Sequence, residues 1–144
     1  LEGSNQLVAI EQGFEIDLGR LVVAGKIDRV ERTGDGLIAA DLKTGKSPSA
    51  KETVEHRQLA LYQLGLRESY DEPVAGGRII SVGSGSLKVL EQPALAGEFQ
   101  ESIMELLSRA ESQIGQASFV ANISEHCTGD SKCQLLMAKA VTHD

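Results

Sequence analysis

The chain has 144 residues, of which 41% are hydrophobic and only 3% aromatic, and its formal net charge is −7. This length is enough for one domain with a substantial core, which must be aliphatic because the sequence contains no Trp. The negative charge excludes nucleic-acid binding by overall charge alone, so any contact with DNA requires a local basic patch, a metal ion or a partner chain. No stretch approaches the roughly 20 apolar residues that span a bilayer, and no signal-peptide pattern is present. We therefore expect a cytoplasmic protein without membrane contact.

Three strands are predicted at the start of the chain. Apolar and partly alternating residues predict strands over 6–18 and 21–32, and the sequence LIAADLK predicts a third over 37–43. Between the last two, residues 33–36 have the sequence TGDG, in which Asp35-Gly36 is a dipeptide typical of hairpin turns. The three strands are expected to form an antiparallel meander.

Two helices and two more strands are predicted downstream. Ser49 and Glu52 match a capping box, which predicts the start of a helix that continues over 50–69. Strands are predicted over 76–83 and 86–93, and apolar spacing predicts a second helix over 98–116 whose end is marked by Gly115. The order β-β-β-α-β-β-α indicates an α/β or α+β domain with about five strands flanked by helices. We expect one domain over 1–144 that ends in a weakly structured tail over 117–144.

Two acids and a lysine lie where the second and third strands should face a core. Asp41 and Lys43 are two residues apart on one strand, so both side chains point to one face and Leu42 points to the other. If the turn closes locally, Asp28 on the preceding strand lies opposite Asp41. Two adjacent carboxylates repel unless a cation lies between them, and Mg²⁺ prefers one or two carboxylates together with water and phosphate oxygens. The alternative is that Asp41 and Lys43 form a solvated pair on an exposed sheet face.

The sequences GKIDRVE, DLKTG and QLALY occur in this order, and together they are far more specific than D-x-K alone. This combination resembles the RecB-type nucleases of the PD-(D/E)XK superfamily, strongly over about residues 6–66 and weakly to the C-terminus. The resemblance implies a restriction-endonuclease-like mixed sheet. The site roles that it implies are metal ligation by Asp28, Asp41 and the backbone carbonyl of Leu42, catalysis by Lys43, and lining of the site by Gln58 and Tyr62.

The resemblance also implies a function. The expected activity is hydrolysis of DNA phosphodiester bonds, as an exonuclease or endonuclease, with Mg²⁺ or Mn²⁺ as cofactor. Within the branch, the sequence is most similar to the C-terminal nuclease domains of AddB- and AdnB-like bacterial helicase-nucleases. The expected partners are DNA, a helicase domain of the same chain and a second helicase-nuclease subunit, acting in double-strand break resection and recombinational repair. Because the chain starts at Leu1 rather than Met, we expect a C-terminal piece of a larger protein. The alternative is a catalytically inert nuclease-like domain that guides DNA or docks a partner.

One departure from the family pattern concerns the metal site. The family places an acid on a helix ahead of the first strand, and this chain offers only Glu2 there. Glu11 and Glu15 are the alternatives, and both are expected to face solvent. The isolated domain is therefore expected to lack a ligand and to have weak activity or none.

A second departure concerns cysteine. Many AddB- and AdnB-like proteins hold a [4Fe-4S] cluster on four Cys residues, whereas this chain has only Cys127 and Cys133. We expect no iron–sulfur cluster in this chain. Zinc binding by His126 with the two thiols is one interpretation, and free thiols in a degenerate cluster tail are the favoured one.

Some charged residues near the motifs are expected to have no catalytic role. Arg29 should point away from Asp28 and have a structural role. Lys46 and Lys51 flank the loop after the third strand; contact with phosphate is one interpretation, and plain solvated loop residues are the favoured one. His56 is expected to be a surface histidine. The sequence has no Walker lysine motif, so the domain itself is not expected to hydrolyse ATP.

Overall fold

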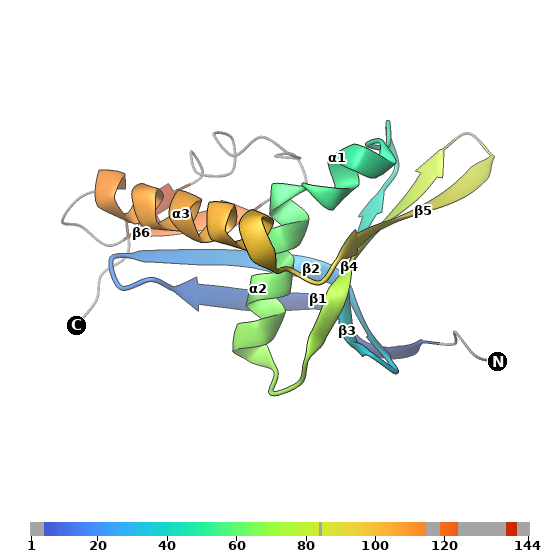
Figure 1. Ribbon diagram of the computed structural model, residues 1–144, viewed down its shortest axis with the longest axis horizontal. Coiled ribbons are helices and arrows are strands. Elements are labelled where there is room, and N and C mark those ends of the chain that lie inside the picture. Colours follow the sequence, from blue (N-terminus) through green and yellow to red (C-terminus); the bar gives the residue numbers. More distant parts are fainter. Residues whose placement is uncertain (1–4, 84, 115–118, 124–137, 141–144) are drawn as a thin grey trace.

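The computed structural model describes residues 5–83, 85–114, 119–123 and 138–140 (Figure 1). The predicted order of three strands, a helical segment, two strands and a helix is confirmed. Two further strands lie in the segment after residue 116, to which the sequence pattern assigned none. The elements are β1 (Gln6–Asp17), β2 (Leu21–Thr33), β3 (Gly36–Lys43), α1 (Ala50–Val54), α2 (Arg57–Ser69), β4 (Val74–Gly83), β5 (Ser86–Pro93), α3 (Gly97–Ile114), β6 (Phe119–Ile123) and β7 (Ala138–Ala140).

All of these strands belong to one mixed sheet in the order β5-β4-β3-β2-β6-β7, with β1 also paired to β2. The predicted antiparallel meander of β1, β2 and β3 is confirmed, and β3 then pairs in parallel with β4. The mixed α+β, restriction-endonuclease-like architecture is confirmed as well. No helix in the described part of the chain is both long and apolar enough to cross a membrane.

The centre of the sheet is β2, because its two edges carry three partner strands. β1 pairs with β2 along almost its whole length and so occupies one edge. The other edge is shared, since residues 21–25 pair with β6 and residues 29–33 pair with β3. Residues 26–28 pair with neither of these two strands, and we call this interval the strand junction.

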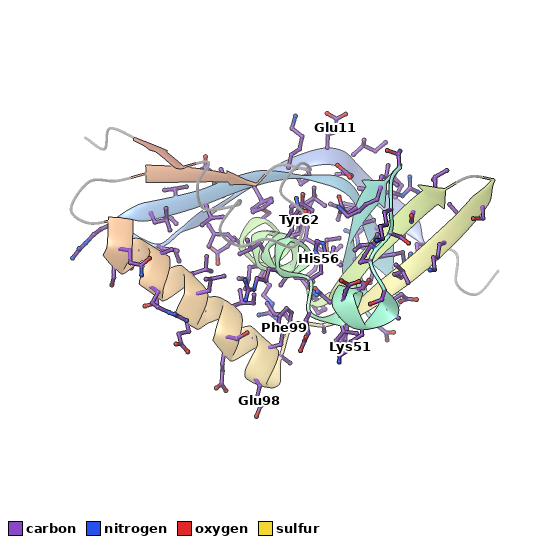
Figure 2. The ribbon with its side chains drawn as sticks, turned by 90° about the horizontal axis from the view of Figure 1, so that it is seen from above. Glu11, Lys51, His56, Tyr62, Glu98 and Phe99 are labelled. Atoms are coloured by element: carbon purple, nitrogen blue, oxygen red, sulfur yellow. The ribbon has the colours of Figure 1, made fainter. Side chains whose placement is uncertain are left out.

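The core lies between the sheet and its two long helices. Figure 2 shows α2 nearly end-on within the curve of the sheet, with α3 on the same side. Every residue of α2 from Gln58 to Leu66 is buried, so this helix is enclosed rather than amphipathic. Phe14 packs its ring edge against Tyr62 with the ring centroids 5.7 Å apart, which joins β1 to α2.

The prediction of one continuous helix over 50–69 is wrong, because the chain breaks between α1 and α2. The predicted capping box of Ser49 and Glu52 is confirmed at the start of α1. His56 has extended backbone dihedral angles and is the N-cap of α2, where its Nδ1 accepts a hydrogen bond from the Leu59 N–H at 3.2 Å. A side chain that satisfies a free N–H at this position favours a new helix start over continuation of the old helix.

Two buried glutamines hold this helix break against the sheet. Gln92 of β5 donates from its Nε2 to the carbonyl oxygens of Thr53 and His56, at 3.0 and 2.9 Å. Gln63 of α2 donates to Gln92 Oε1 at 2.8 Å, so both amides are held by defined partners. Thr53 O also accepts from the His56 N–H and His56 O from the Ala60 N–H, so Gln92 is an additional donor that ties the end of α1 and the start of α2 to β5.

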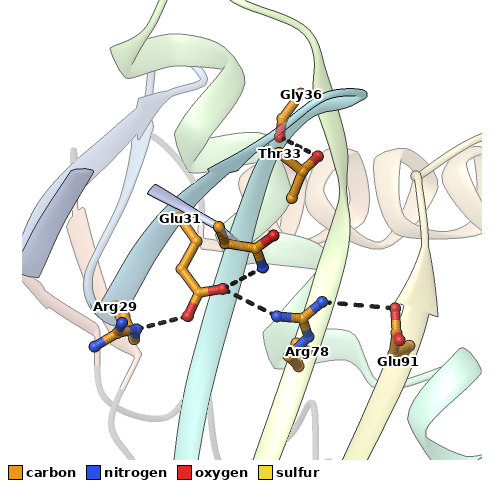
Figure 3. A network of polar contacts seen from close by, with 7 residues as sticks. Arg29, Glu31, Thr33, Gly36, Arg78 and Glu91 are labelled. Carbon is orange, nitrogen blue, oxygen red and sulfur yellow. Dashed lines mark hydrogen bonds and ion pairs between the residues drawn. The ribbon is translucent and has the colours of Figure 1, made fainter. Parts of the chain in front are cut away.

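A second polar network, centred on the buried Glu31, lies on the sheet face opposite Val30 and Ala39 (Figure 3). Glu31 of β2 contacts Arg29 at 2.6 Å and Arg78 of β4 at 2.9 Å, and Arg78 also lies 3.9 Å from Glu91 of β5. Burial alone raises the pKa of Glu31, but the hydrogen bonds and positive charges around it outweigh burial and hold its pKa below the ordinary value. The network connects three strands, and Arg29 has the structural contacts that its sequence position suggested.

The turn between β2 and β3 differs by one residue from the predicted one. Its two central residues are Gly34 and Asp35, and Gly36 is already the first residue of β3. Gly36 has φ +138°, and a Cβ added there would lie 2.5 Å from the carbonyl oxygen of Pro73. Only glycine fits this close approach of two backbones, which sets where β3 begins beside β4.

Gly36→Ala is expected to lower the free energy of unfolding by about 2 kcal/mol or more, because it combines backbone strain with a clash against a main-chain oxygen. Gly34→Ala in the same turn is the matched control, since nothing lies within 4 Å of its added Cβ. Urea unfolding of both variants measures the difference. Equal stability of the two variants would show that the contact with Pro73 is not restrictive.

Candidate active site

Asp28 lies at the end of the strand junction, where the hydrogen-bond ladder between β2 and β3 stops. The last paired residues are Arg29 and Ala40, so the next facing position brings Asp28 opposite Asp41, as the sequence predicted. Asp28 Oδ2 accepts a hydrogen bond from the Leu42 N–H at 2.8 Å. The Asp28 carboxylate thus accepts the hydrogen bond that a main-chain carbonyl of β2 would accept if the ladder continued. The two acids therefore lie opposite each other where β2 and β3 separate.

Asp41 and Lys43 point to the same face of β3, as predicted, and neither is a solvated edge residue. Asp41 is 1% exposed, and the side chain of Lys43 is 10% exposed. Lys43 Nζ lies 2.7 Å from Asp41 Oδ2. In the described part of the chain both carboxylate oxygens of Asp41 are buried without a well-aligned hydrogen bond, and only Oδ2 has an ion-pair contact, with Lys43. The alternative of a solvated pair is therefore wrong, and a buried ion pair with one unsatisfied oxygen takes its place.

The pKa of Asp41 is raised to about 6, mainly because burial disfavours the charged carboxylate. Lys43 lowers this pKa by its hydrogen bond and its charge, while the adjacent Asp28 raises it further. A buried carboxylate that keeps an unsatisfied oxygen and an elevated pKa is poorly stabilised by the protein itself. A second positive charge at this point would stabilise its ionised form.

Gln58 and Tyr62 lie one turn apart on α2 and are both buried. Gln58 Nε2 donates a hydrogen bond to the hydroxyl of Tyr62 at 3.0 Å, which fixes the two polar groups relative to each other. Their expected role in lining the site stays a prediction. The side chain of Leu42 is 49% exposed on the opposite face from Asp41, and the metal-binding role of its carbonyl also stays a prediction.

His56 is the residue that the sequence analysis placed wrongly. The expected surface histidine is only 6% exposed, and it lines a pocket of about 510 Å³ together with Lys43. Burial and the positive charge of Lys43 lower its pKa to about 4, against a smaller opposing effect of Glu52. The sequence signal that could have found it is the position of His56 just ahead of the leucine-rich helical run LALYQLGL, where a helix start requires an N-cap.

Several other predicted candidates do not join this site. Glu11 and Glu15 are exposed, as expected, and Glu11 lies 3.7 Å from Lys26. Lys51 is exposed too, whereas Lys46, also exposed, lines the same pocket as Lys43 and His56. The candidates Glu2, His126, Cys127 and Cys133 lie outside the described residues.

The arrangement of a mixed sheet with Asp28, Asp41 and Lys43 at a strand junction can be compared with known proteins. The model of the PD-(D/E)XK nuclease superfamily matches residues 1–136. The chain belongs to the PD-(D/E)XK nuclease superfamily. The comparison with curated proteins gave no match.

A solved structure is similar to this PD-(D/E)XK domain at a low level of identity. The crystal structure of SSO0001 aligns with 82% of this chain at a TM-score of 0.45 and 17% sequence identity. The alignment covers 52% of that chain, so the present chain spans about half of its length.

PD-(D/E)XK nucleases typically use a divalent metal ion, and the acids of this site fit one. In residues 5–83, 85–114, 119–123 and 138–140, no group of three or more His, Cys, Asp or Glu residues is arranged to hold a metal. Mg²⁺, however, commonly takes only one or two carboxylates and completes its shell with water. Asp28 and Asp41 supply two facing carboxylates, and the buried Oδ1 of Asp41 has no hydrogen-bond partner in the part of the chain that the structure describes. The donor set suits a hard cation with oxygen ligands.

Asp41 and His56 are expected to have opposite effects on stability as the pH changes. Because the pKa of Asp41 is raised in the folded state, its contribution to the free energy of unfolding is largest below its unfolded pKa of about 3.8. This contribution is lost as the pH rises through about 6. Because the pKa of His56 is lowered in the folded state, its contribution to the free energy of unfolding is fully present above pH 6.5 or so. This contribution is lost as the pH falls towards about 4. Between pH 5 and 6.5 the two slopes are expected nearly to cancel in the native sequence.

Single variants should separate these two effects. In EDTA, Asp41→Asn is expected to lose roughly 1 to 2 kcal/mol of stability as the pH falls from 6.5 to 5, and His56→Asn to gain roughly 1 kcal/mol. Urea unfolding across this range measures both, with Asp35→Asn as a surface control. Parallel pH profiles of the two variants would contradict the opposite shifts.

Proposed function

We propose that this domain is a RecB-type, metal-dependent deoxyribonuclease that hydrolyses phosphodiester bonds. The observation that carries the proposal is the buried Asp41 carboxylate, which lies between Asp28 and Lys43 and whose Oδ1 has neither a hydrogen-bond donor nor an ion-pair partner among the described residues. A structural ion pair would satisfy both oxygens of a buried acid. A carboxylate left partly unsatisfied beside a second acid is suited to a metal ion instead.

Asp28 and Asp41, with the carbonyl of Leu42, are the proposed ligands of Mg²⁺ or Mn²⁺. Such an ion supplies Lewis-acid polarisation of the scissile phosphate and lowers the pKa of a bound water. Asp28 is already fixed by the Leu42 N–H at 2.8 Å, so this ligand needs little ordering. The remaining oxygens of the two acids are the ones available to a cation.

Lys43 is the proposed catalytic lysine. Its ammonium is held 2.7 Å from Asp41 Oδ2 in a nearly closed environment, where a positive charge has more effect than in water. From this position it orients an attacking water or stabilises negative charge that develops on the phosphate. Gln58 and Tyr62, joined by a 3.0 Å hydrogen bond, are proposed to shape the wall of the site on α2.

The wider setting is proposed from the motif resemblance alone. The sequence EHRQLALYQLGL favours an AddB- or AdnB-like helicase-nuclease in which a helicase domain and a second subunit deliver DNA for break resection in the cytoplasm. A partner that delivers DNA is consistent with the net charge of −7, which provides no long-range attraction for DNA.

An inert nuclease-like domain is the second candidate. Two carboxylates, rather than three metal-binding groups, are brought together in the described part of the chain. The inert domain would guide DNA or dock a partner without metal. Metal binding that depends on the acids distinguishes the two candidates.

Asp41→Asn is expected to abolish Mn²⁺ binding in a calorimetric titration and to reduce cleavage of linear DNA by at least about 100-fold, because the ion loses a charged ligand. Asp35→Asn, which removes an exposed carboxylate in the β2–β3 turn, is the matched control and should behave as the native protein. Lys43→Met is expected to reduce cleavage while retaining Mn²⁺ binding.

Two outcomes would contradict the proposal. Retained cleavage by Asp41→Asn would remove this acid from the reaction. Failure of the native protein to bind Mn²⁺ or to cleave DNA, also in a longer chain that supplies an upstream acid, would favour the inert domain.

A further inference from the structure

The pocket beside Lys43 is built by the loop after β3 and by α1. It has a volume of about 510 Å³, and its lining residues are Lys43, Lys46, Ser47, Pro48, Glu52, Glu55 and His56. Lys43 belongs to the proposed reaction centre, so the pocket is continuous with it. None of the other lining residues has a role in the proposed reaction.

The hydrogen bond at the start of α2 determines which nitrogen of His56 carries a proton. Nδ1 accepts a hydrogen bond from the Leu59 N–H at 3.2 Å, and a ring nitrogen that accepts must be unprotonated. In the neutral ring the proton is therefore on Nε2. The pKa of about 4 keeps the ring neutral at physiological pH.

Nε2–H of His56 is a donor without a described acceptor. The residue is 6% exposed and lines the pocket, and the hydrogen bonds that it forms among the described residues use Nδ1 and its main-chain groups. A rigid, neutral donor in a nearly buried ring is suited to an acceptor that enters the pocket, because the ring needs neither ordering nor a change of protonation.

The charges of the pocket favour a ligand with a single negative charge. Lys43 and Lys46 contribute positive charge, and Glu52 and Glu55 contribute negative charge, so a multiply charged anion gains little. Glu52 is also engaged by the Ser49 N–H at 2.8 Å within the capping box. A phosphodiester has one charge and several acceptor oxygens, which matches a neutral donor flanked by a lysine.

We propose that this pocket binds a backbone phosphate of the DNA strand next to the scissile one, with His56 Nε2–H as its central donor. Lys46 and Ser47 are the further donors in reach of the pocket. The inference rests on the proposed nuclease function for the identity of the strand. It gives His56 a binding role in addition to its role as the N-cap of α2.

His56→Asn tests this role because asparagine is a good N-cap but lacks a donor at the position of Nε2. In EDTA, the dissociation constant for a single-stranded DNA oligonucleotide is expected to rise about tenfold, as for the loss of a hydrogen bond to a charged group. His56→Asp, which also retains a capping oxygen but adds negative charge, should weaken binding further. Glu55→Gln removes an acid from the same pocket and should strengthen binding.

A ¹⁵N NMR experiment on the native protein gives a readout that a purely structural role would not affect. At neutral pH the ring nitrogens of His56 are expected to show an unprotonated Nδ1 and a protonated Nε2, and addition of the oligonucleotide should shift the Nε2 resonance. Inorganic phosphate at the same concentration should not shift it. An equal response to free phosphate would contradict the assignment to a DNA strand.

The outcomes separate this inference from the proposed function. Native-like DNA affinity of a folded His56→Asn variant, or no DNA binding by the native protein, would overturn the phosphate site. If His56→Asn binds DNA like the native protein but Asp41→Asn loses cleavage, the nuclease function is still supported. DNA binding that depends on His56 without cleavage under any metal would instead support the pocket and contradict the nuclease.

Discussion

The buried charge of Asp41 is the constraint on which the arrangement of the site depends. An ionised carboxylate that is 1% exposed is costly unless its surroundings compensate for it, and among the described residues only Oδ2 has a positive partner, Lys43 at 2.7 Å. Lys43 can reach that oxygen because strand alternation places residues two apart on one face. Asp28 comes close because β2 and β3 stop pairing one position earlier. The geometry of the sheet thus produces the electrostatics of the site.

The strand junction explains why this separation of strands is tolerated inside a sheet. β2 is held by β1 along one edge, so its backbone remains ordered where β3 and β6 leave the other edge. β3 meanwhile keeps pairing with β4 beyond the junction, through Asp41, Leu42 and Lys43. β2 and β3 are therefore each paired on the side away from the junction, so both strands keep a hydrogen-bonded neighbour where they separate from each other. Rigid support of this kind is what a preorganised site requires.

The local parts of this site could be predicted from the sequence, while the long-range parts could not. Alternation and a short turn were sufficient to place Asp28 opposite Asp41 and Lys43 beside it. Alternation also placed Asp41 on the face that should meet a core, but a solvated pair stayed open as an alternative, because the extent of burial depends on packing between segments far apart in the sequence. The position of His56 was mispredicted for a similar reason, since Gln92, 36 residues away, supplies the bonds that stabilise the break between α1 and α2. Glu31 likewise looks like an ordinary strand acid until Arg78 of β4 is brought beside it.

His56 and Asp41 show two different solutions to the burial of a titratable group next to one lysine. His56 avoids the cost by staying neutral, since the charge of Lys43 and burial both lower its pKa. Asp41 cannot fully avoid the cost of a buried charge, because Lys43 favours the ionised carboxylate while burial and Asp28 disfavour it. The lysine therefore keeps the acid ready for a cation and the histidine ready to donate a hydrogen bond. In the proposed nuclease, one ammonium thus prepares both the metal-binding acid and the neighbouring phosphate donor, which couples binding of the strand to the reaction centre.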